Sequence, residues 1–147
     1  MSIKDVLNRD MKLALKEGRK AKLSTIRMAR SAILYAEKAK LRELDEDEVI
    51  EVLFREVKTR KNDAAEYERL GKMDVAEDLQ REIEVLQSYL PQMLTADEVE
   101  EIVRQSIVEV GANSVKDLGK VMGAVMPKVK GRADGGIVNT LAKKLLQ

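Results

Sequence analysis

The sequence predicts an all-α protein of about seven helices, and three observations lead to this prediction. Ala, Leu, Glu, Lys, Arg and Met, which are good helix formers, are abundant among the 147 residues. The β-branched residues recur at the three- and four-residue spacing of a helix face, not in the alternation of a strand. Only two prolines interrupt the chain, and cap-forming residues and glycines divide it into helix-sized segments.

Four helices are predicted before Pro91. Ser2, with Asp5 three residues later, is placed to cap the first helix, and Gly18 lies just past its end. The acids Asp45 to Glu48 suit the cap and first turn of the third helix, because carboxylates are favoured at a helix N-terminus. The apolar stripes predict these ranges: Ser2 to Gly18, about Leu23 to Leu44, Asp45 to Gly71, and Met73 or Asp74 onward.

Three helices are predicted after Pro91, which disfavours helix at Leu90 and therefore marks a boundary. Thr95 and Glu98 form the capping-box pattern of a fifth helix, which Gly111 ends. The other start and stop signals are these: Ser114 with Asp117 starts the sixth helix, Pro127 ends or kinks it, and Asp134 caps the seventh.

The boundary at Pro91 divides the chain into two predicted regions. Residues 1–90 are expected to form a four-helix region, because long charged helices are typical of an antiparallel hairpin bundle. Residues 91–147 are expected to form a compact three-helix domain.

The composition excludes several classes of site. The chain has no Cys and no His, which excludes zinc fingers, cysteine and histidine nucleophiles, serine triads and disulfides. A metal site would need oxygen ligands alone, and the acids Asp45 to Glu48 lack the glycine and spacing of a calcium loop. We therefore predict no metal, no cofactor and no catalytic residue.

Neither end of the chain nor its interior suggests a membrane. The apolar runs are only a few residues long, so no segment is predicted to span a bilayer. The N-terminus carries acids and lacks the apolar stretch of a signal peptide. We expect a cytoplasmic location.

The formal net charge of +1 hides a gradient along the chain. Residues 1–90 hold 19 basic and 19 acidic side chains, and residues 91–115 hold one basic and five acidic ones. Residues 116–147 hold seven basic and two acidic side chains. Any attraction for a polyanion is therefore expected near the C-terminus.

Most of this basic charge falls between Lys116 and Arg132. Lys116 and Lys120 are four residues apart and are expected to share a helix face. The glycine-bearing connection that follows carries the other candidates for phosphate binding, which are Lys128, Lys130, Gly131 and Arg132. Glycine lets a backbone approach a phosphate, and the start of the last helix near Asp134 adds a positive dipole end. On the local pattern alone, solvated surface is the simpler interpretation.

Two further features of this region have structural interpretations. Gly119 and Gly123 form a G-x-x-x-G spacing, which in a chain without membrane spans favours close helix packing. Met122 and Met126 lie on the apolar stripe and are expected in the core. No aromatic residue is interleaved with the basic ones, so a nucleic acid would be bound through its backbone and shape, not by base stacking.

The strings SYLPQMLTADEVEEIV, from Ser88, and KDLGKVMGAVMPKVKGRADG, from Lys116, resemble the YqeY family. That family is similar to the C-terminal tail domain of the amidotransferase subunit GatB. The resemblance extends more loosely through the first half and so covers nearly the whole chain. The family motif falls on Gly119, Lys120, Gly123, Met126, Pro127, Lys128, Lys130, Gly131, Arg132, Asp134 and Gly135.

The resemblance implies a helical bundle followed by a three-helix domain, and it implies tRNA as a partner, since the tail domain of the amidotransferase helps to hold tRNA. The motif's basic residues would bind phosphate, and Gly119, Gly123, Pro127, Asp134 and Gly135 would be structural. Stand-alone members are commonly grouped with carbon–nitrogen ligases that use glutamine as amido donor.

Three hypotheses follow from these observations. The first is an RNA-binding accessory module without a catalytic site of its own, for tRNA or another structured RNA. The second is a component of a glutamine-dependent carbon–nitrogen ligase, although the chain has no Cys, no P-loop and no amidase-like serine pair with lysine. The third is a docking module for an aminoacyl-tRNA synthetase, an amidotransferase or the ribosome.

Overall fold

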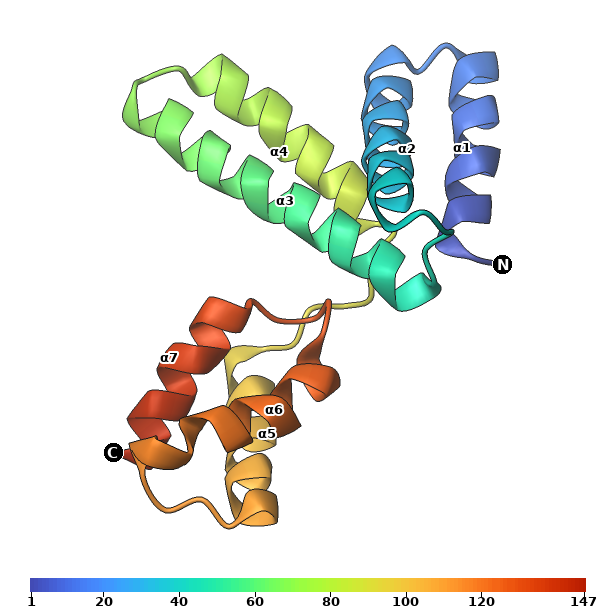
Figure 1. The fold of residues 1–147 in the computed structure, drawn as a ribbon. Helices are drawn as coiled ribbons and strands as arrows, with labels where there is room; N and C mark the ends of the chain where they lie inside the picture. The colour runs from blue at the N-terminus through green and yellow to red at the C-terminus, as the bar shows by residue number, and fades with distance from the viewer. The chain divides into compact units, whose positions relative to one another are not determined.

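The computed structural model describes residues 1–147 and is all-α, as predicted (Figure 1). It contains seven α-helices, one 3₁₀ turn and no strand. The chain divides into two compact units, Met1–Leu90 and Pro91–Gln147. No helix combines the length and the apolar character that crossing a bilayer requires.

The first unit contains four helices arranged as two antiparallel pairs (Figure 1). They are α1 (Ile3–Glu17), α2 (Lys20–Lys40), α3 (Glu46–Arg69) and α4 (Met73–Gln87). One apolar cluster joins them, and its best-buried members come from all four helices: Leu7, Ile26, Leu53, Ile83 and Leu86. Helical periodicity places these residues on the inner faces, where their burial drives the packing.

The predicted caps of this unit are confirmed. Ser2 and Asp5 form a capping box at the start of α1, and Asp45 and Glu48 form another at the start of α3. Gly18 ends α1 with φ of 71°, a left-handed conformation that glycine adopts without strain. These helix ends depend on interactions between residues close together in the chain, so the sequence alone is enough to predict them.

The predicted bounds of the second helix are wrong by about a turn at its end. The helix ends at Lys40, because Leu41 adopts a left-handed φ of 57°. The Glu37 carboxylate then accepts a hydrogen bond from the Leu44 backbone N–H at 2.9 Å, which fixes the connection to α3. Leu41 carries no glycine-like signal, so this C-terminus depends on a contact that local pattern does not reveal.

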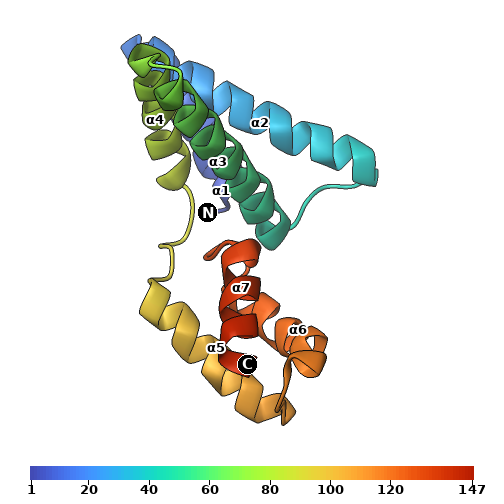
Figure 2. The ribbon, with the colours of Figure 1, turned by 90° about the vertical axis from the view of Figure 1, so that its left-hand side faces the viewer.

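The second unit packs three helices around a core made largely of valine. Its elements are α5 (Ala96–Val110), the 3₁₀ turn η1 (Val115–Asp117), α6 (Leu118–Val129) and α7 (Gly135–Leu146). Figures 1 and 2 show α7 lying beside both α5 and α6. The predicted capping box of Thr95 and Glu98 and the ending at Gly111 are confirmed.

Two expectations for the sixth helix need correction. Ser114 caps a 3₁₀ turn, with its side chain accepting from the Lys116 N–H, and α6 itself begins only at Leu118. Lys116 therefore lies outside the helix that carries Lys120. Of the two effects expected of Pro127, an end or a kink, the end is wrong, because the helix continues through Pro127 to Val129. The buried Val125 and Val129 flank the proline and hold this last turn in the core.

Candidate nucleic-acid interface

Helix α6 has a sharply divided surface. Val121, Val125 and Val129 are fully buried in the core of the second unit. Gly119, Gly123 and Pro127 recur every four residues and are exposed to solvent. Because residues four apart share a helix face, these three form one exposed stripe without long side chains, which we call the glycine face.

The interpretation of Gly119 and Gly123 as close helix packing is wrong. A Cβ atom added at either glycine would have nothing within 4 Å. No neighbouring helix therefore requires a glycine at these positions. The sequence shows the spacing of the two glycines, but it does not show which side of α6 faces the core.

Pro127 changes the hydrogen bonding of the glycine face. Proline has no backbone N–H, so it cannot donate to the carbonyl of Gly123, its partner four residues earlier in the helix. Gly123 is itself exposed. The face therefore carries a backbone carbonyl that lacks its usual helical donor.

Lys116 and Lys120 are the cations beside this face that have no partner. Both are exposed, and the structure gives neither an ion pair nor a side-chain hydrogen bond. Lys120 lies next to Gly119 on α6, and Lys116 lies on η1, which leads into α6. Lys130, the residue directly after α6, is also exposed.

Lys128 has partners within the unit, which its position in the sequence did not reveal. Its Nζ lies 2.9 Å from a carboxylate oxygen of Glu109 and 3.2 Å from the hydroxyl of Ser106. Ser106 is fully buried on α5. Lys128 thus ties α6 to α5, and a phosphate would have to compete with Glu109 for it.

Gly131 and Arg132 hold the chain together at the end of α6. Gly131 is buried and has φ of 74°, so it serves the turn and offers a phosphate no exposed surface. The Arg132 guanidinium donates to the Gln92 carbonyl at 3.0 Å, and the Arg132 carbonyl accepts from the Leu94 N–H at 2.9 Å. Arg132 therefore anchors the segment that leads into α5.

The start of α7 is closed by its own cap, as the sequence predicts. The Asp134 side chain accepts from the Gly136 N–H at 2.8 Å. A Cβ atom at Gly135 would lie 3.4 Å from the Met126 methyl, so this glycine permits a close contact with α6. The carboxylate of Asp134 occupies the place in which an anion at this helix N-terminus was expected.

Of the predicted phosphate-binding set, Lys116, Lys120 and Lys130 are therefore exposed beside the glycine face, whereas Lys128, Gly131 and Arg132 have internal roles. No group of three or more Cys, His, Asp or Glu side chains is placed to hold a metal ion. The arrangement suits backbone contacts with a polyanion.

The fold and this face together define a class: a helical protein of two units, whose second unit presents a glycine-faced basic helix. The chain belongs to the YqeY-like protein family, whose model matches residues 4–146. The resemblance seen in the sequence is thereby confirmed over nearly the whole chain.

Three relatives show how far the similarity extends. The chain is 29% identical over 131 residues to Altered inheritance of mitochondria protein 41, mitochondrial, of Pyrenophora tritici-repentis, covering 86% of this chain and 71% of that protein. It is 39% identical over 59 residues to the E subunit of glutamyl-tRNA(Gln) amidotransferase from Thermococcus gammatolerans, and 43% identical over 49 residues to the same protein from Thermococcus sibiricus.

The likeness to the amidotransferase is partial. The two alignments cover 37% and 33% of this chain, and only 9% and 8% of the amidotransferase chains. The chain is thus related to a small part of those proteins, and the activity of the whole amidotransferase does not follow from it.

Proposed function

We propose that this protein is an RNA-binding accessory protein, with tRNA as its RNA, and that it binds through the second unit without catalysing a reaction of its own. The observation that carries the proposal is the exposed glycine face of α6, flanked by the unpaired Lys116 and Lys120. A nucleic-acid backbone can approach such a face closely, because no long side chain stands on it and two of its three residues are glycines.

The chemistry of this face matches an RNA strand. Lys116, Lys120 and Lys130 supply positive charge for phosphates, which provide most of the affinity in nucleic-acid binding. The Gly123 carbonyl, which lacks its helical donor, is an acceptor for a ribose 2′-hydroxyl. A 2′-hydroxyl is absent from DNA, so this contact favours RNA.

The choice of tRNA rests on the relatives. Two of the similar proteins belong to an amidotransferase named for glutamyl-tRNA(Gln), and the similarity lies in a segment that makes up less than a tenth of each of them. Holding tRNA is the simplest function for such a small shared segment of the amidotransferase to retain.

The test is a titration of the full chain into labelled total tRNA, from about 50 to 200 mM salt. We expect saturable binding that weakens with salt. We expect Lys116→Glu with Lys120→Glu to reduce the steepness of the log–log salt dependence by about two, because each lost phosphate contact removes about one unit of slope.

The matched control is Lys143→Glu with Lys144→Glu, which makes the same change in charge in the same unit, on exposed lysines of α7. We expect this control to keep most of the wild-type salt slope. Equal losses in the two double variants would contradict the placement of the site on the glycine face, and circular dichroism melts verify that both remain folded.

A further inference from the structure

The first unit, which is neutral as a whole, is divided into two strongly charged halves. Residues 1–42 hold 12 basic and four acidic side chains, whereas residues 43–90 hold seven basic and 15 acidic ones. The two halves therefore carry net charges of +8 and −8. The positive half is the pair α1 and α2, and α2 alone has six basic residues and one acid.

The cations of α2 form an ordered stripe. Exposed residues recur at intervals of three or four along the helix, and they therefore share one face, which we call the α2 stripe. Its members are Lys20, Ser24, Arg27, Ser31, Leu34 and Lys38. At 1.5 Å per residue the stripe is about 27 Å long.

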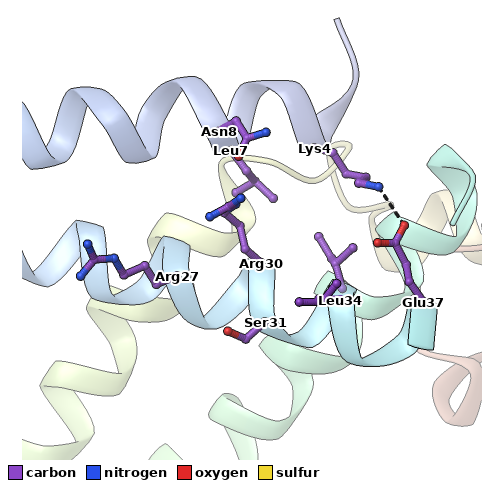
Figure 3. A pocket seen from close by; sticks show the side chains of 9 residues that line it. Lys4, Leu7, Asn8, Arg27, Arg30, Ser31, Leu34 and Glu37 are labelled. Carbon is purple, nitrogen blue, oxygen red and sulfur yellow. Dashed lines mark hydrogen bonds and ion pairs between the residues drawn. The ribbon is translucent and has the colours of Figure 1, made fainter. Parts of the chain in front are cut away.

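Two hollows flank the centre of this stripe. One, of about 360 Å³, lies between α1 and α2, and Figure 3 shows Leu7, Leu34 and the Arg30 guanidinium facing it. The other, of about 640 Å³, is lined by residues that include Lys20 and Ser24. Arg27 and Ser31 line both hollows.

The guanidinium groups at the stripe are not neutralised by acids. The structure gives Lys20, Arg27, Arg30 and Lys38 no ion pair, and the Arg30 guanidinium donates to the Met11 sulfur at 3.0 Å. Arg30 lies three residues from Arg27, so the two groups can act together on one anion.

The acids that line the two hollows already have other partners. Lys4 pairs with Glu37 at 2.8 Å across one end of the hollow between α1 and α2, and its hydrogen bond holds the pKa of Glu37 below its usual range (Figure 3). Glu56, which lines the other hollow, pairs with Arg60 at 3.2 Å. These acids are therefore not free to form ion pairs with Arg27 and Arg30.

We propose that the α2 stripe, together with Arg30 on the hollow beside it, is a second RNA-binding surface, which holds the phosphate backbone through Arg27 and Arg30. Guanidinium groups donate paired hydrogen bonds that match phosphate oxygens, and the Ser24 and Ser31 hydroxyls add further donors beside them. The exposed Leu34 side chain offers an apolar contact to the carbon face of a ribose.

The pattern of the stripe favours a nucleic-acid strand over an acidic protein helix. An amphipathic helix needs a continuous apolar seam to dock on, and the stripe offers only Leu34 among its six residues. Cations and hydroxyls spaced over about 27 Å suit a regular polyanion instead. The identification of that polyanion as RNA rests on the proposed function.

The experiment compares the full-length wild type with Arg27→Glu plus Arg30→Glu in the same tRNA titration. We expect the double variant to bind at least about tenfold more weakly and to lose about two units of salt slope. Arg27→Gln plus Arg30→Gln, which removes the charge without reversing it, is expected to show a smaller loss of the same kind, and it covers the case in which the reversal impairs folding.

The matched control is Arg55→Glu plus Lys61→Glu on α3. These residues are exposed and have no ion pair in the structure, and the substitutions change the net charge by the same amount. If this control loses as much affinity as the α2 variant, the α2 stripe is not the site.

The outcomes separate this inference from the proposed function. Loss of binding in the Lys116 and Lys120 variant but not in the Arg27 and Arg30 variant overturns the α2 stripe and leaves the proposed function standing. Absence of saturable tRNA binding by the wild type overturns both. If poly-glutamate at equal charge competes as well as tRNA does, the ligand is an acidic protein. That result would overturn the assignment of RNA as the ligand.

Discussion

At the scale of single residues, the contact between Tyr89 and Asp10 shows how the first unit is closed. The Tyr89 hydroxyl donates to an Asp10 carboxylate oxygen at 2.6 Å, joining the chain just after α4 to α1. This hydrogen bond lowers the pKa of Asp10. Burial, together with the same bond, raises the pKa of Tyr89. Both shifts favour the pair of neutral phenol and ionised carboxylate.

We expect Tyr89→Phe to lower the free energy of unfolding at pH 7 by about 1.5 kcal/mol, because a hydrogen bond to a charged group is lost. The folded pKa of Asp10 is depressed, so its contribution is present above its unfolded pKa and is lost as the pH falls below about 4. The difference between wild type and variant should therefore shrink in acid. Urea unfolding at pH 7 and pH 3 measures it, and a difference that persists undiminished at low pH would refute this account.

Single residues also show what local sequence predicts well. The capping residues Ser2, Asp45, Thr95 and Asp134 were predicted correctly, because each cap depends on groups two or three residues away. The internal role of Lys128 was not predictable. Its partners, Ser106 and Glu109, lie 22 and 19 residues away on another helix.

At the scale of elements, α6 shows where prediction from the spacing of residues fails. The predicted apolar stripe included Val125 and Val129, which are fully buried, but it missed the fully buried Val121 and included Val115, which is exposed. The glycine spacing predicted packing, although Gly119 and Gly123 face solvent. A helix in a three-helix unit has one face against the core, and the small residues here lie on the other side.

The exposed glycines lead to a prediction that separates stability from binding. Gly119→Ala with Gly123→Ala should raise the free energy of unfolding by about 1 kcal/mol, because alanine favours the helix and nothing lies within 4 Å of the added methyl groups. The same methyl groups should keep an RNA strand away from the backbone and weaken tRNA binding by about tenfold, equivalent to ~1.4 kcal/mol. A thermal melt and a tRNA titration test both parts.

A variant that is more stable and binds less tightly supports a face whose glycines serve RNA contact. A variant that is more stable and binds tRNA as well as the wild type contradicts the need for a bare backbone on α6. In that case the lysines alone would account for binding.

At the scale of the whole molecule, the net charge of the first unit conceals two oppositely charged parts. The balance of zero for residues 1–90 hides net charges of +8 and −8 on either side of residue 42. A finer division of the same sequence, at the connection between α2 and α3, reveals them. The sequence could not predict that Arg27 and Arg30 line a hollow with Leu7, because Leu7 lies on another helix, α1.

The family match over residues 4–146 includes both units, so the two belong to one family architecture. Each unit offers its own basic surface: the glycine face of α6 in the second, and the α2 stripe in the first. The proposed binding of RNA is therefore the property that links the fold, the charge and the relatives.

The measurement that tests this central claim most directly is competition for the full chain between labelled total tRNA and unlabelled competitors, at about 100 mM salt. We expect unlabelled tRNA to displace the label at a much lower nucleotide concentration than duplex DNA does, because the contacts proposed for the α6 face include 2′-hydroxyl groups as well as phosphates. Equal displacement by tRNA and duplex DNA, or no saturable tRNA binding, would contradict it.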